Sequence, residues 1–451
     1  MIAWLKAKRN AERACSFARC GTIHCPGAST FTSFFASCRR AWSPRCAAQP
    51  SCCSTAPFAK GAALTNIGAL SARGTRQSGT LPYHMRILYF INGFDPGGAE
   101  HGLLTLLQAG FFSGHELKIL ACCRGRGALA DEIAAKIGEH NLILTSQSEE
   151  PSLRTFVSTF FVMLRLIREW RPDMVVLSLK QANLLGRLVA MFAPRLRCVS
   201  FEHIARYRSR RAEGVYGPVL KALSWRVDEI WADCENTLRE TQAYFLPRRR
   251  RSHVVPLFRA DGASSHKRDY ALHTPLRLAA AGRLMARKNF DRLIEAVRML
   301  QDRGVSASLD LYGDGPEWQA LSRKADELGI RDRVHFHGYV ARWFELACDR
   351  DMFINLSDTE GFCIVVAEAM LAGLPIIATD VGGIRDYGKH GENMLKLTVP
   401  SAEMAVTQVL VLAGDETLRR EIGIQARHDM LEAYSQDALR VRATAVLGGG
   451  M

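Results

Sequence analysis

From Met85 onward, short apolar runs alternate with amphipathic stretches of helical length. The runs expected as buried strands are residues 86–91, 117–121, 142–144, 174–178, 197–201, 229–232 and 253–255. The stretches with helical spacing are residues 98–111, 128–137, 153–170, 182–192, 216–225 and 235–245. This alternation predicts a parallel sheet covered by helices on both faces.

The alternation lapses between residues 258 and 274, where a polar segment predicts a linker. A second series follows, with strands expected at 276–281, 308–312, 334–337, 352–356 and 374–378 and helices at 290–301, 317–328, 364–372, 403–413 and 416–434. We predict two Rossmann-like doubly wound α/β domains facing across a cleft, where ligands of such folds bind. Their expected bounds are 85–257 and 276–430, with a linker at 258–275. Residues 431–451 are expected to form a C-terminal helix that packs back on the N-terminal domain.

The first 84 residues differ from the rest in charge and cysteine content. They carry +10 of the chain's net charge of +14, which leaves a mild +4, and they hold seven of its 13 cysteines. They contain no apolar stretch suited to a secretory signal. A transit peptide, a disordered tail and a reading frame begun too early all remain open. We favour the last, because Met85 opens a good first strand.

The remaining composition is ordinary for a globular protein. A length of 451 residues favours two domains, and 48% hydrophobic with 23% charged residues is typical of soluble chains. The cysteines include adjacent pairs but no C-x-x-C spacing, so we expect neither a zinc site nor a disulfide framework. We therefore expect the protein to act in a reducing compartment. No apolar run is long enough for a transmembrane helix.

Two basic residues stand at a predicted strand end. The strand at 276–281 runs into Gly282 and Arg283, and Lys288 precedes the helix expected near Asn289. Cations beside a helix N-terminus are suited to a diphosphate. A solvated basic loop is the alternative for this pair alone.

Two glutamates lie eight positions apart in the segment that follows the strand at 352–356. Glu360 falls in a loop and Glu368 inside the next helix, among apolar neighbours. A buried carboxylate needs a partner, and two sugar hydroxyls side by side would supply one. A local pairing of Glu368 is the alternative.

In this setting the chain resembles the retaining glycosyltransferases of family 4, which have the GT-B fold. Glu360 and Glu368 match the E-x7-E signature of that family. Gly282-Arg-Leu-x3-Lys288-Asn289 and Tyr312-Gly-Asp-Gly-Pro316 also match, as do the glycine-rich loop from Asp95 to Glu100 and the strand that ends at His203. The likeness covers the chain from Met85 almost to its end.

The resemblance implies roles for the matching residues. Arg283 and Lys288 would hold the donor diphosphate, and Glu368 the ribose hydroxyls. Glu360 and the amides of Gly361, Phe362, Cys363 and Ile364 would hold the transferred sugar and its phosphate. Gly97 and Gly98 would let the first helix approach the donor. His203 would contact the sugar from the opposite domain, with a structural histidine as the alternative. The residues expected to be catalytic are His203, Glu360, Arg283 and Lys288; no nucleophile is assigned.

Four positions depart from the family pattern. Cys363 replaces a common glycine and Leu257 a common asparagine. Asp386 replaces a usual glutamate and Met394 a usual glycine. These changes bear on the donor type more than on the reaction class.

Other signals are weaker. Asp349-Arg-Asp351 matches a metal-binding D-x-D pattern, but it directly precedes a strand. We expect no metal and no cofactor, since the nucleotide-sugar is a substrate. Basic clusters lie at 206–211, at 248–251 and in the helix with Arg154, Arg165 and Arg168. A solvated face and an anionic membrane surface remain open for them, whereas no base-stacking motif favours nucleic acid.

We therefore predict transfer of a sugar from a nucleotide-sugar to a glycan or lipid-linked acceptor in surface polysaccharide or glycolipid synthesis. The expected place is the cytoplasm or the inner membrane face. A sugar-nucleotide epimerase, a phosphorylase and a catalytically silent glycan- or nucleotide-binding protein of the same fold are the alternatives.

Overall fold

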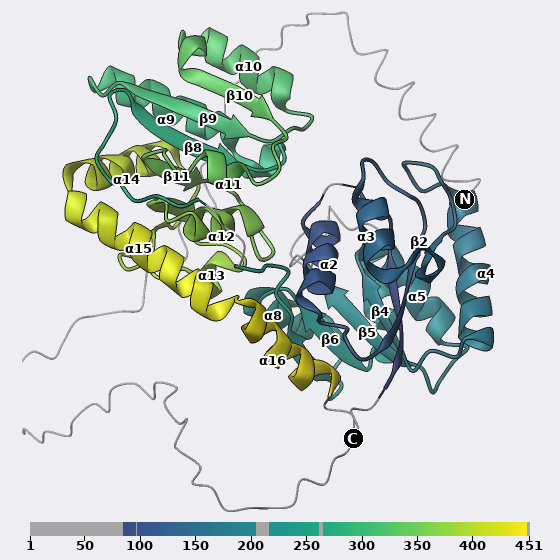
Figure 1. The fold of residues 1–451 in the computed structure, drawn as a ribbon. Helices are drawn as coiled ribbons and strands as arrows, with labels where there is room; N and C mark the ends of the chain where they lie inside the picture. The colour runs from purple at the N-terminus through teal and green to yellow at the C-terminus, as the bar shows by residue number, and fades with distance from the viewer. Residues whose placement is uncertain (1–83, 96, 204–215, 261–264, 449–451) are drawn as a thin grey trace, which may run out of the picture. The chain divides into compact units, whose positions relative to one another are not determined.

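The computed structural model describes residues 84–95, 97–203, 216–260 and 265–448, which form two parallel sheets with their helices (Figure 1). The predictions for residues 1–83 and for the basic cluster at 206–211 lie outside the described residues, as do parts of the linker (261–264) and the C-terminal end (449–451). Within the described residues the structure confirms the predicted fold class of two doubly wound α/β units.

The first sheet has seven parallel strands in the order β3-β2-β1-β4-β5-β6-β7. The strands are β1 (Arg86–Ile91), β2 (Glu116–Ala121), β3 (Leu142–Leu144), β4 (Met174–Ser178), β5 (Arg197–Glu202), β6 (Glu229–Ala232) and β7 (Arg251–Val254). The order reverses between β1 and β4, which is where open parallel sheets of this kind bind ligands.

Successive residues of β1 and β4 feed two separate cores, because neighbouring side chains of a strand point to opposite faces. Ile87 and Tyr89 pack under α2 (Gly98–Ala109) and α3 (Leu129–Ile137). Leu88 and Phe90 pack under α4 (Leu153–Glu169) and α5 (Lys180–Ala190) on the other face (Figure 1). The remaining helices of this half are α7 (Tyr216–Ala222) and α8 (Glu235–Tyr244), with 3-10 turns at Glu139–Asn141 and Leu223–Arg226.

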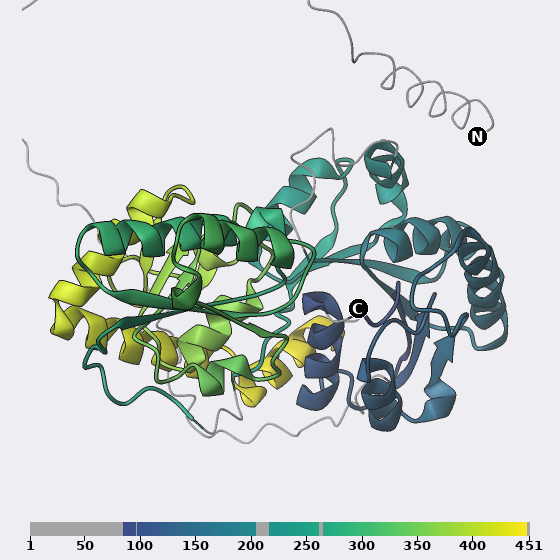
Figure 2. The same ribbon diagram turned by 90° about the horizontal axis from the view of Figure 1, so that it is seen from above.

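The second sheet has six parallel strands in the order β10-β9-β8-β11-β12-β13. They are β8 (Leu276–Ala281), β9 (Ala307–Tyr312), β10 (Val334–Gly338), β11 (Met352–Asn355), β12 (Ile376–Thr379) and β13 (Leu395–Leu397). Helices cover both faces (Figure 2). They are α9 (Phe290–Asp302), α10 (Trp318–Glu327), α11 (Trp343–Leu346), α12 (Ile364–Leu371), α13 (Ile384–Tyr387), α14 (Ala402–Gly414) and α15 (Glu416–Ala433), with 3-10 turns at Ala286–Lys288 and Arg331–Arg333.

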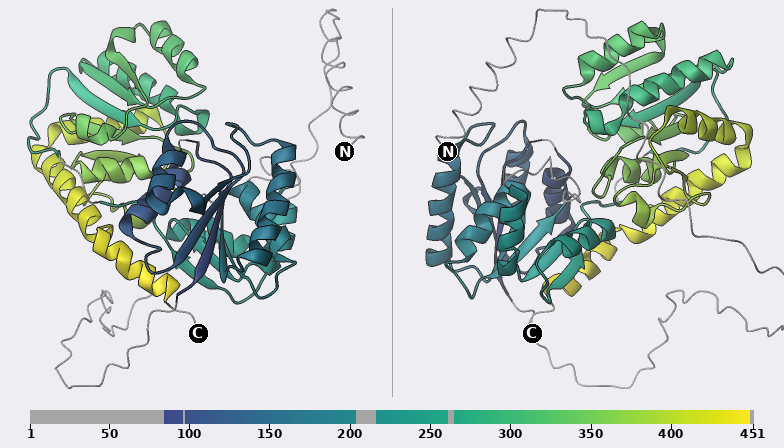
Figure 3. Two further views of the ribbon diagram at one scale, coloured as in Figure 1. Left: turned by 45° about the vertical axis from the view of Figure 1, so that its right-hand side comes forward. Right: turned by 180° about the vertical axis from the view of Figure 1, so that it is seen from behind.

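The last helix, α16 (Gln436–Leu447), follows α15 and lies beside α2 (Figure 3). Its Ala443, Val446 and Leu447 join the core of the first sheet. The segment between the two sheets also packs, since Phe258 stacks on Phe362 with ring centroids 5.9 Å apart and Lys267 is buried. The described residues of the predicted linker are therefore packed on either side of residues 261–264. Among the described residues, no helix is both long and apolar enough to cross a membrane.

Candidate functional site

The glycine-rich loop lies between β1 and α2. Gly97 is the N-cap of α2 in extended conformation, and Gly98 is its first residue. A Cβ placed on Gly98 would lie 3.6 Å from the Cδ1 atom of Ile364, at the start of α12. The N-termini of α2 and α12 therefore lie close to each other, and both carry a partial positive charge.

His203 directly follows β5 and is buried. Its Nε2 atom lies 2.8 Å from the Ser178 hydroxyl at the end of β4, and its ring lies against Phe201 at 4.3 Å between centroids. A Cβ on Gly361 would lie only 1.9 Å from the His203 carbonyl oxygen. Glycine is required at 361 for this approach, which brings His203 next to the loop that carries Glu360.

The loop after β8 brings Lys288 to Glu360. Lys288 ends a 3-10 turn and is buried, and its Nζ donates to Glu360 Oε1 at 2.5 Å. Arg287 donates to the Thr359 carbonyl at 3.0 Å, and Asn289 reaches Asp358 at 2.9 Å. The sequence analysis assigned these two loops separately to the sugar-nucleotide. In the structure they are joined to each other by hydrogen bonds.

Glu360 is held in its charged form. Burial acts to raise its pKa, but the adjacent Lys288 charge and its hydrogen bond outweigh burial, with smaller contributions from Ser357 and Arg287. The resulting pKa lies below the ordinary value for a glutamate. A buried ion pair of this kind keeps a fixed carboxylate and a fixed ammonium beside the N-terminus of α12.

Arg283 differs from Lys288 in being exposed. Within the described part of the chain, its guanidinium has neither a hydrogen bond nor an ion pair. It follows Gly282, whose carbonyl lies 2.0 Å from the Cβ that Gly313 lacks. The Tyr312-Gly-Asp-Gly motif therefore packs its backbone directly on the strand end that carries Arg283.

The N-terminus of α12 is built on an unusual residue. Cys363 is the N-cap and has φ 64°, a left-handed conformation that favours glycine. Its carbonyl accepts a hydrogen bond from the Tyr387 hydroxyl at 3.1 Å. Burial raises the pKa of the Cys363 thiol. The cysteine that replaces the family's glycine therefore adopts a backbone conformation that glycine would adopt more easily. Its thiol is buried and protonated.

Glu368 lies inside α12 and has a partner that the sequence did not suggest. Its Oε2 atom accepts a hydrogen bond of 2.7 Å from the indole Nε1 of Trp343 in α11. Burial raises the pKa of Glu368 to about 7, against the opposing effects of Trp343 and Arg342. The indole of Trp343 is in turn stacked on Phe353 at 5.2 Å. One carboxylate oxygen is thus oriented by a rigid aromatic group.

Asp233 is a second residue that the sequence analysis missed. It follows β6, and its Oδ2 accepts the Phe362 backbone N–H at 2.9 Å. Burial raises the pKa of Asp233 to about 7. A polar residue at the carboxyl end of a parallel strand was the available signal. Asp233 therefore fixes the loop of Glu360 and Gly361 from the first sheet.

The two aspartates of the D-x-D motif have protein partners. Asp351 is fully buried and accepts hydrogen bonds from the Arg277 and His273 amides, at 2.7 and 3.3 Å. Asp349 pairs with Arg350 at 2.7 Å. Among the described residues, the metal-capable group with ligand atoms close together is His428, Asp429 and Glu432 on α15, of which Asp429 is half-buried and the other two are exposed. Asn393 donates to Asp429 of that set at 2.7 Å.

Comparison with known proteins gives the family. The model of the Glycosyltransferase Family 4 domain matches residues 96–258, and that of Glycosyl transferases group 1 matches residues 265–429. N-acetyl-alpha-D-glucosaminyl L-malate synthase of Bacillus anthracis is 36% identical over 135 residues, which are 30% of this chain and 35% of that protein. The lipopolysaccharide core biosynthesis glycosyltransferase LpsD of Rhizobium meliloti (strain 1021) is 26% identical over 61% of this chain and 75% of its own length.

Solved structures agree in fold. Anabaena Alr3699/HepE in complex with UDP-glucose has a TM-score of 0.68 at 18% identity, over 81% of this chain and 100% of that one. The chain spans about a third of the length of the first relative and all of this structure. Together, the two family models and the two parallel sheets show that the chain belongs to the group 1 glycosyltransferases of family 4 and has the GT-B fold.

Proposed function

We propose that the protein transfers a sugar from a nucleoside-diphosphate sugar to a glycan or lipid-linked acceptor. The observation that carries this proposal is the convergence on the N-terminus of α12. There Gly98 faces Ile364, His203 contacts Gly361, and Lys288 pairs with Glu360. Relatives by name act in lipopolysaccharide core synthesis and on phosphatidylinositol mannosides, which favours a surface glycan or glycolipid product.

The leaving diphosphate is the group that needs stabilising. Arg283 is exposed and has no partner among the described residues, so its guanidinium is available for phosphate oxygens. Lys288 and the first amides of α12 add fixed positive charge. Cations and helix dipoles can meet this demand without a metal ion or another cofactor. We infer retention of anomeric configuration, as the family implies, and assign no nucleophile.

The ribose is the natural ligand of Glu368. Trp343 occupies one carboxylate oxygen, so the other is directed to the hydroxyls of the nucleotide. The Phe362 amide, which the sequence assigned to the sugar, instead donates to Asp233. Gly361 would hold the transferred sugar together with Glu360, and His203 would contact it from the first sheet. These roles remain part of the proposal.

The proposed place of action is the cytoplasm, at the inner face of the membrane. All six cysteines in the described part of the chain are free thiols, which fits a reducing compartment. A lipid-linked acceptor would be met at that membrane face.

The test measures nucleoside diphosphate released from UDP-, GDP- and ADP-sugars, with and without candidate glycan and glycolipid acceptors. We expect release with one nucleotide class in proportion to the glycosylated acceptor. An epimerase would convert the sugar without release, a phosphorylase would require orthophosphate, and a silent binding protein would leave every donor intact. Any of these three results would refute the proposal.

The site assignment is tested with matched arginine variants. Arg283→Ala should lower donor turnover by about 100-fold or more, because charge stabilisation at the leaving group is lost. Arg323→Ala is the control, since Arg323 is an exposed arginine of α10. Equal turnover in the two variants would remove Arg283 from the site.

A further inference from the structure

The outer face of α4 is apolar where a solvent-facing helix is normally polar. Leu153, Val157 and Phe161 have exposed fractions of 70%, 52% and 63%. They recur every fourth residue, so they lie in one row along the helix. Met163 and two threonines on the opposite side are buried against the first sheet.

The end of α5 extends this apolar row. Phe192 and Met191, which directly follow α5, have exposed fractions of 71% and 45%. The Phe160 ring connects the two helices, with centroids 5.5 Å from Phe161 and 6.5 Å from Phe192. We call these five exposed residues the α4–α5 patch: Leu153, Val157, Phe161, Met191 and Phe192.

The unpaired charges on α4 are positive, and the exposed acids just before the helix, Glu149 and Glu150, are paired with Arg126. The exposed charged residues of α4 are Arg154, Arg165, Arg168 and Glu169, and Glu169 is paired with Arg165 at 2.9 Å. Arg154 and Arg168 have no hydrogen-bond or ion-pair partner within the described ranges. The apolar row therefore has unneutralised guanidinium groups along it.

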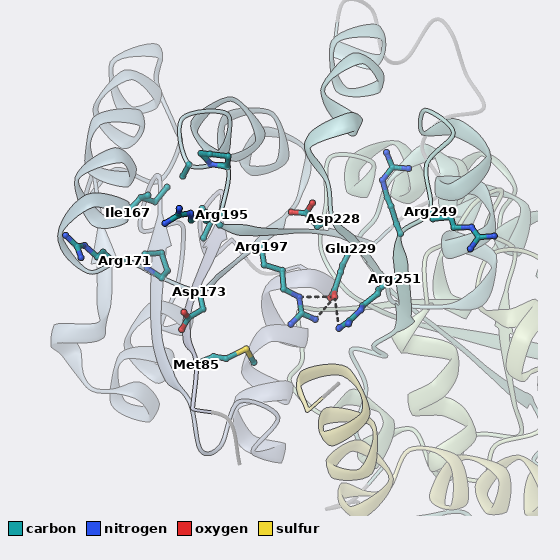
Figure 4. A pocket seen from close by; sticks show the side chains of 15 residues that line it. Met85, Ile167, Arg171, Asp173, Arg195, Arg197, Asp228, Glu229, Arg249 and Arg251 are labelled. Atoms are coloured by element: carbon teal, nitrogen blue, oxygen red, sulfur yellow. Dashed lines mark hydrogen bonds and ion pairs between the residues drawn. The ribbon is translucent and has the colours of Figure 1, made fainter. Parts of the chain in front are cut away.

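A basic pocket begins where α4 and α5 end (Figure 4). Ile167 lies near the end of α4 and Arg171 just after it, and Ala193 and Arg195 come from the connection after α5. Its lining holds six arginines and three acids, and two of the arginines, Arg197 and Arg251, pair with Glu229 (Figure 4). Arg171 and Arg195 are exposed, and neither pairs with another residue that the structure describes. Positive charge thus continues from the patch along the amino-terminal ends of the strands of the first sheet.

We propose that the α4–α5 patch docks the protein on an anionic lipid surface. Exposed leucine, valine and phenylalanine side chains partition into the boundary between headgroups and acyl chains, and each nearby arginine adds about 1 kcal/mol of attraction to anionic headgroups. Anionic headgroups in a fluid lipid surface can move to pair with scattered guanidinium groups. A protein partner would instead need carboxylates at fixed, matching positions. The inference rests on the proposed function in one respect, because a lipid-linked acceptor would be reached from this surface.

The test is co-sedimentation of the full chain with phosphatidylcholine vesicles, with and without phosphatidylglycerol. We expect binding only to the anionic vesicles, weakened by salt. The double variant Val157→Asp with Phe161→Asp should bind at least about 10-fold more weakly. Ile424→Asp is the control, because Ile424 is 51% exposed on α15, away from the α4–α5 patch.

A charge test uses the arginines. Arg154→Glu with Arg168→Glu should also lose most of the vesicle binding, whereas Arg323→Glu on α10 should not. Unchanged vesicle binding in the α4 variants would overturn the proposal, as would equal binding to neutral vesicles. A patch that serves a protein partner would give no vesicle binding in any variant, which also refutes it.

Donor turnover in solution separates this inference from the proposed function. The α4 variants should release nucleoside diphosphate from soluble donor and acceptor at the unaltered rate, since the α4–α5 patch is separate from the residues of the candidate site. Loss of that activity together with loss of vesicle binding would indicate a folding defect and would contradict a specific docking role. Vesicle binding by a chain that turns over no donor would refute the proposed function and leave the docking surface standing.

Discussion

The two glutamates on either side of the N-terminus of α12 are eight residues apart, yet their surroundings favour opposite charge states. Glu360 lies in the loop after β11 and pairs with Lys288, which keeps its pKa below the ordinary value. Glu368 lies in the helix beside a neutral indole, and burial raises its pKa to about 7. Two identical side chains in one signature therefore behave differently: Glu360 stays ionised, whereas Glu368 titrates near neutral pH.

The difference comes from the partner and not from burial. Glu360 is buried and Glu368 only half-buried, so burial alone would raise the pKa of Glu360 at least as much. Only Glu360 has a full positive charge within hydrogen-bond distance. An indole N–H offsets part of the cost of desolvation and cannot neutralise a charge. Substitutions at four positions test this contrast.

The largest effect is expected for Lys288→Ala, which leaves the buried Glu360 carboxylate without its counter-charge. We expect a loss of about 3–5 kcal/mol in the free energy of unfolding, measured by urea denaturation. Lys324→Ala is the control, because the Lys324–Glu295 pair is partly exposed and should contribute less than about 1 kcal/mol. Equal losses in the two variants would show that the Lys288–Glu360 pair is not the buried ion pair described.

Glu368→Gln should change the pH dependence of stability. A carboxyl whose folded pKa is raised to about 7 contributes stability at low pH that is lost between its unfolded pKa, about 4.3, and pH 7. The glutamine variant escapes that loss. Relative to the unsubstituted chain it should therefore gain on the order of 2 kcal/mol in unfolding free energy at pH 8, and much less at pH 5. A stability difference that does not vary with pH would contradict the raised pKa.

Trp343→Phe removes the N–H donor to Glu368 and keeps the ring packing on Phe353. The carboxylate loses a hydrogen bond to its charged form, so the pKa of Glu368 should rise further, by about one pH unit. The acid limb of the pH profile of kcat/KM for the donor should move up by the same amount. Trp318→Phe on α10 is the matched control, and an unmoved limb in Trp343→Phe would exclude the orienting role.

Cys363 separates the two glutamates and gives the smallest effect. Cys363→Gly and Cys363→Ala both remove the buried thiol, but only glycine relieves the left-handed backbone at φ 64°. The glycine variant should be more stable than the alanine variant by about 1 kcal/mol in thermal unfolding. Equal melting temperatures would mean that the backbone at 363 carries no strain.

Much of the fold could be predicted from the chain, because buried parallel strands such as 86–91 are short apolar runs. The strand β13 (Leu395–Leu397) was missed because a lysine interrupts its apolar residues, whereas the equally short β3 (Leu142–Leu144) is a continuous apolar run. The four-residue helix α11 was missed because it has barely one turn, and Trp343 was missed with it. Periodicity identifies faces of long elements and says little about such short pieces.

The candidate site was likewise predicted only in part. Lys288, Glu360 and Glu368 were identified from their motifs, but the sequence assigned Lys288 and Glu360 to the ligand and did not pair them with each other. That pairing depends on two loops 72 residues apart meeting in space. Asp233 is separated even further along the chain from its partner: it accepts a hydrogen bond from the Phe362 amide, 129 residues away in sequence. Contacts across such separations are set by the tertiary fold and leave no local signal.

The most direct test of the contrast compares how the two glutamates respond to the ribose hydroxyls. Calorimetric titration would measure the affinity of UDP, GDP and ADP and of their 2′,3′-dideoxy forms for the unsubstituted chain, Glu368→Gln and Glu360→Gln. We expect that removing the hydroxyls weakens binding about 10-fold in the unsubstituted chain and in Glu360→Gln, and leaves it unchanged in Glu368→Gln. A 10-fold loss that persists in Glu368→Gln would show that Glu368 does not bind the ribose hydroxyls.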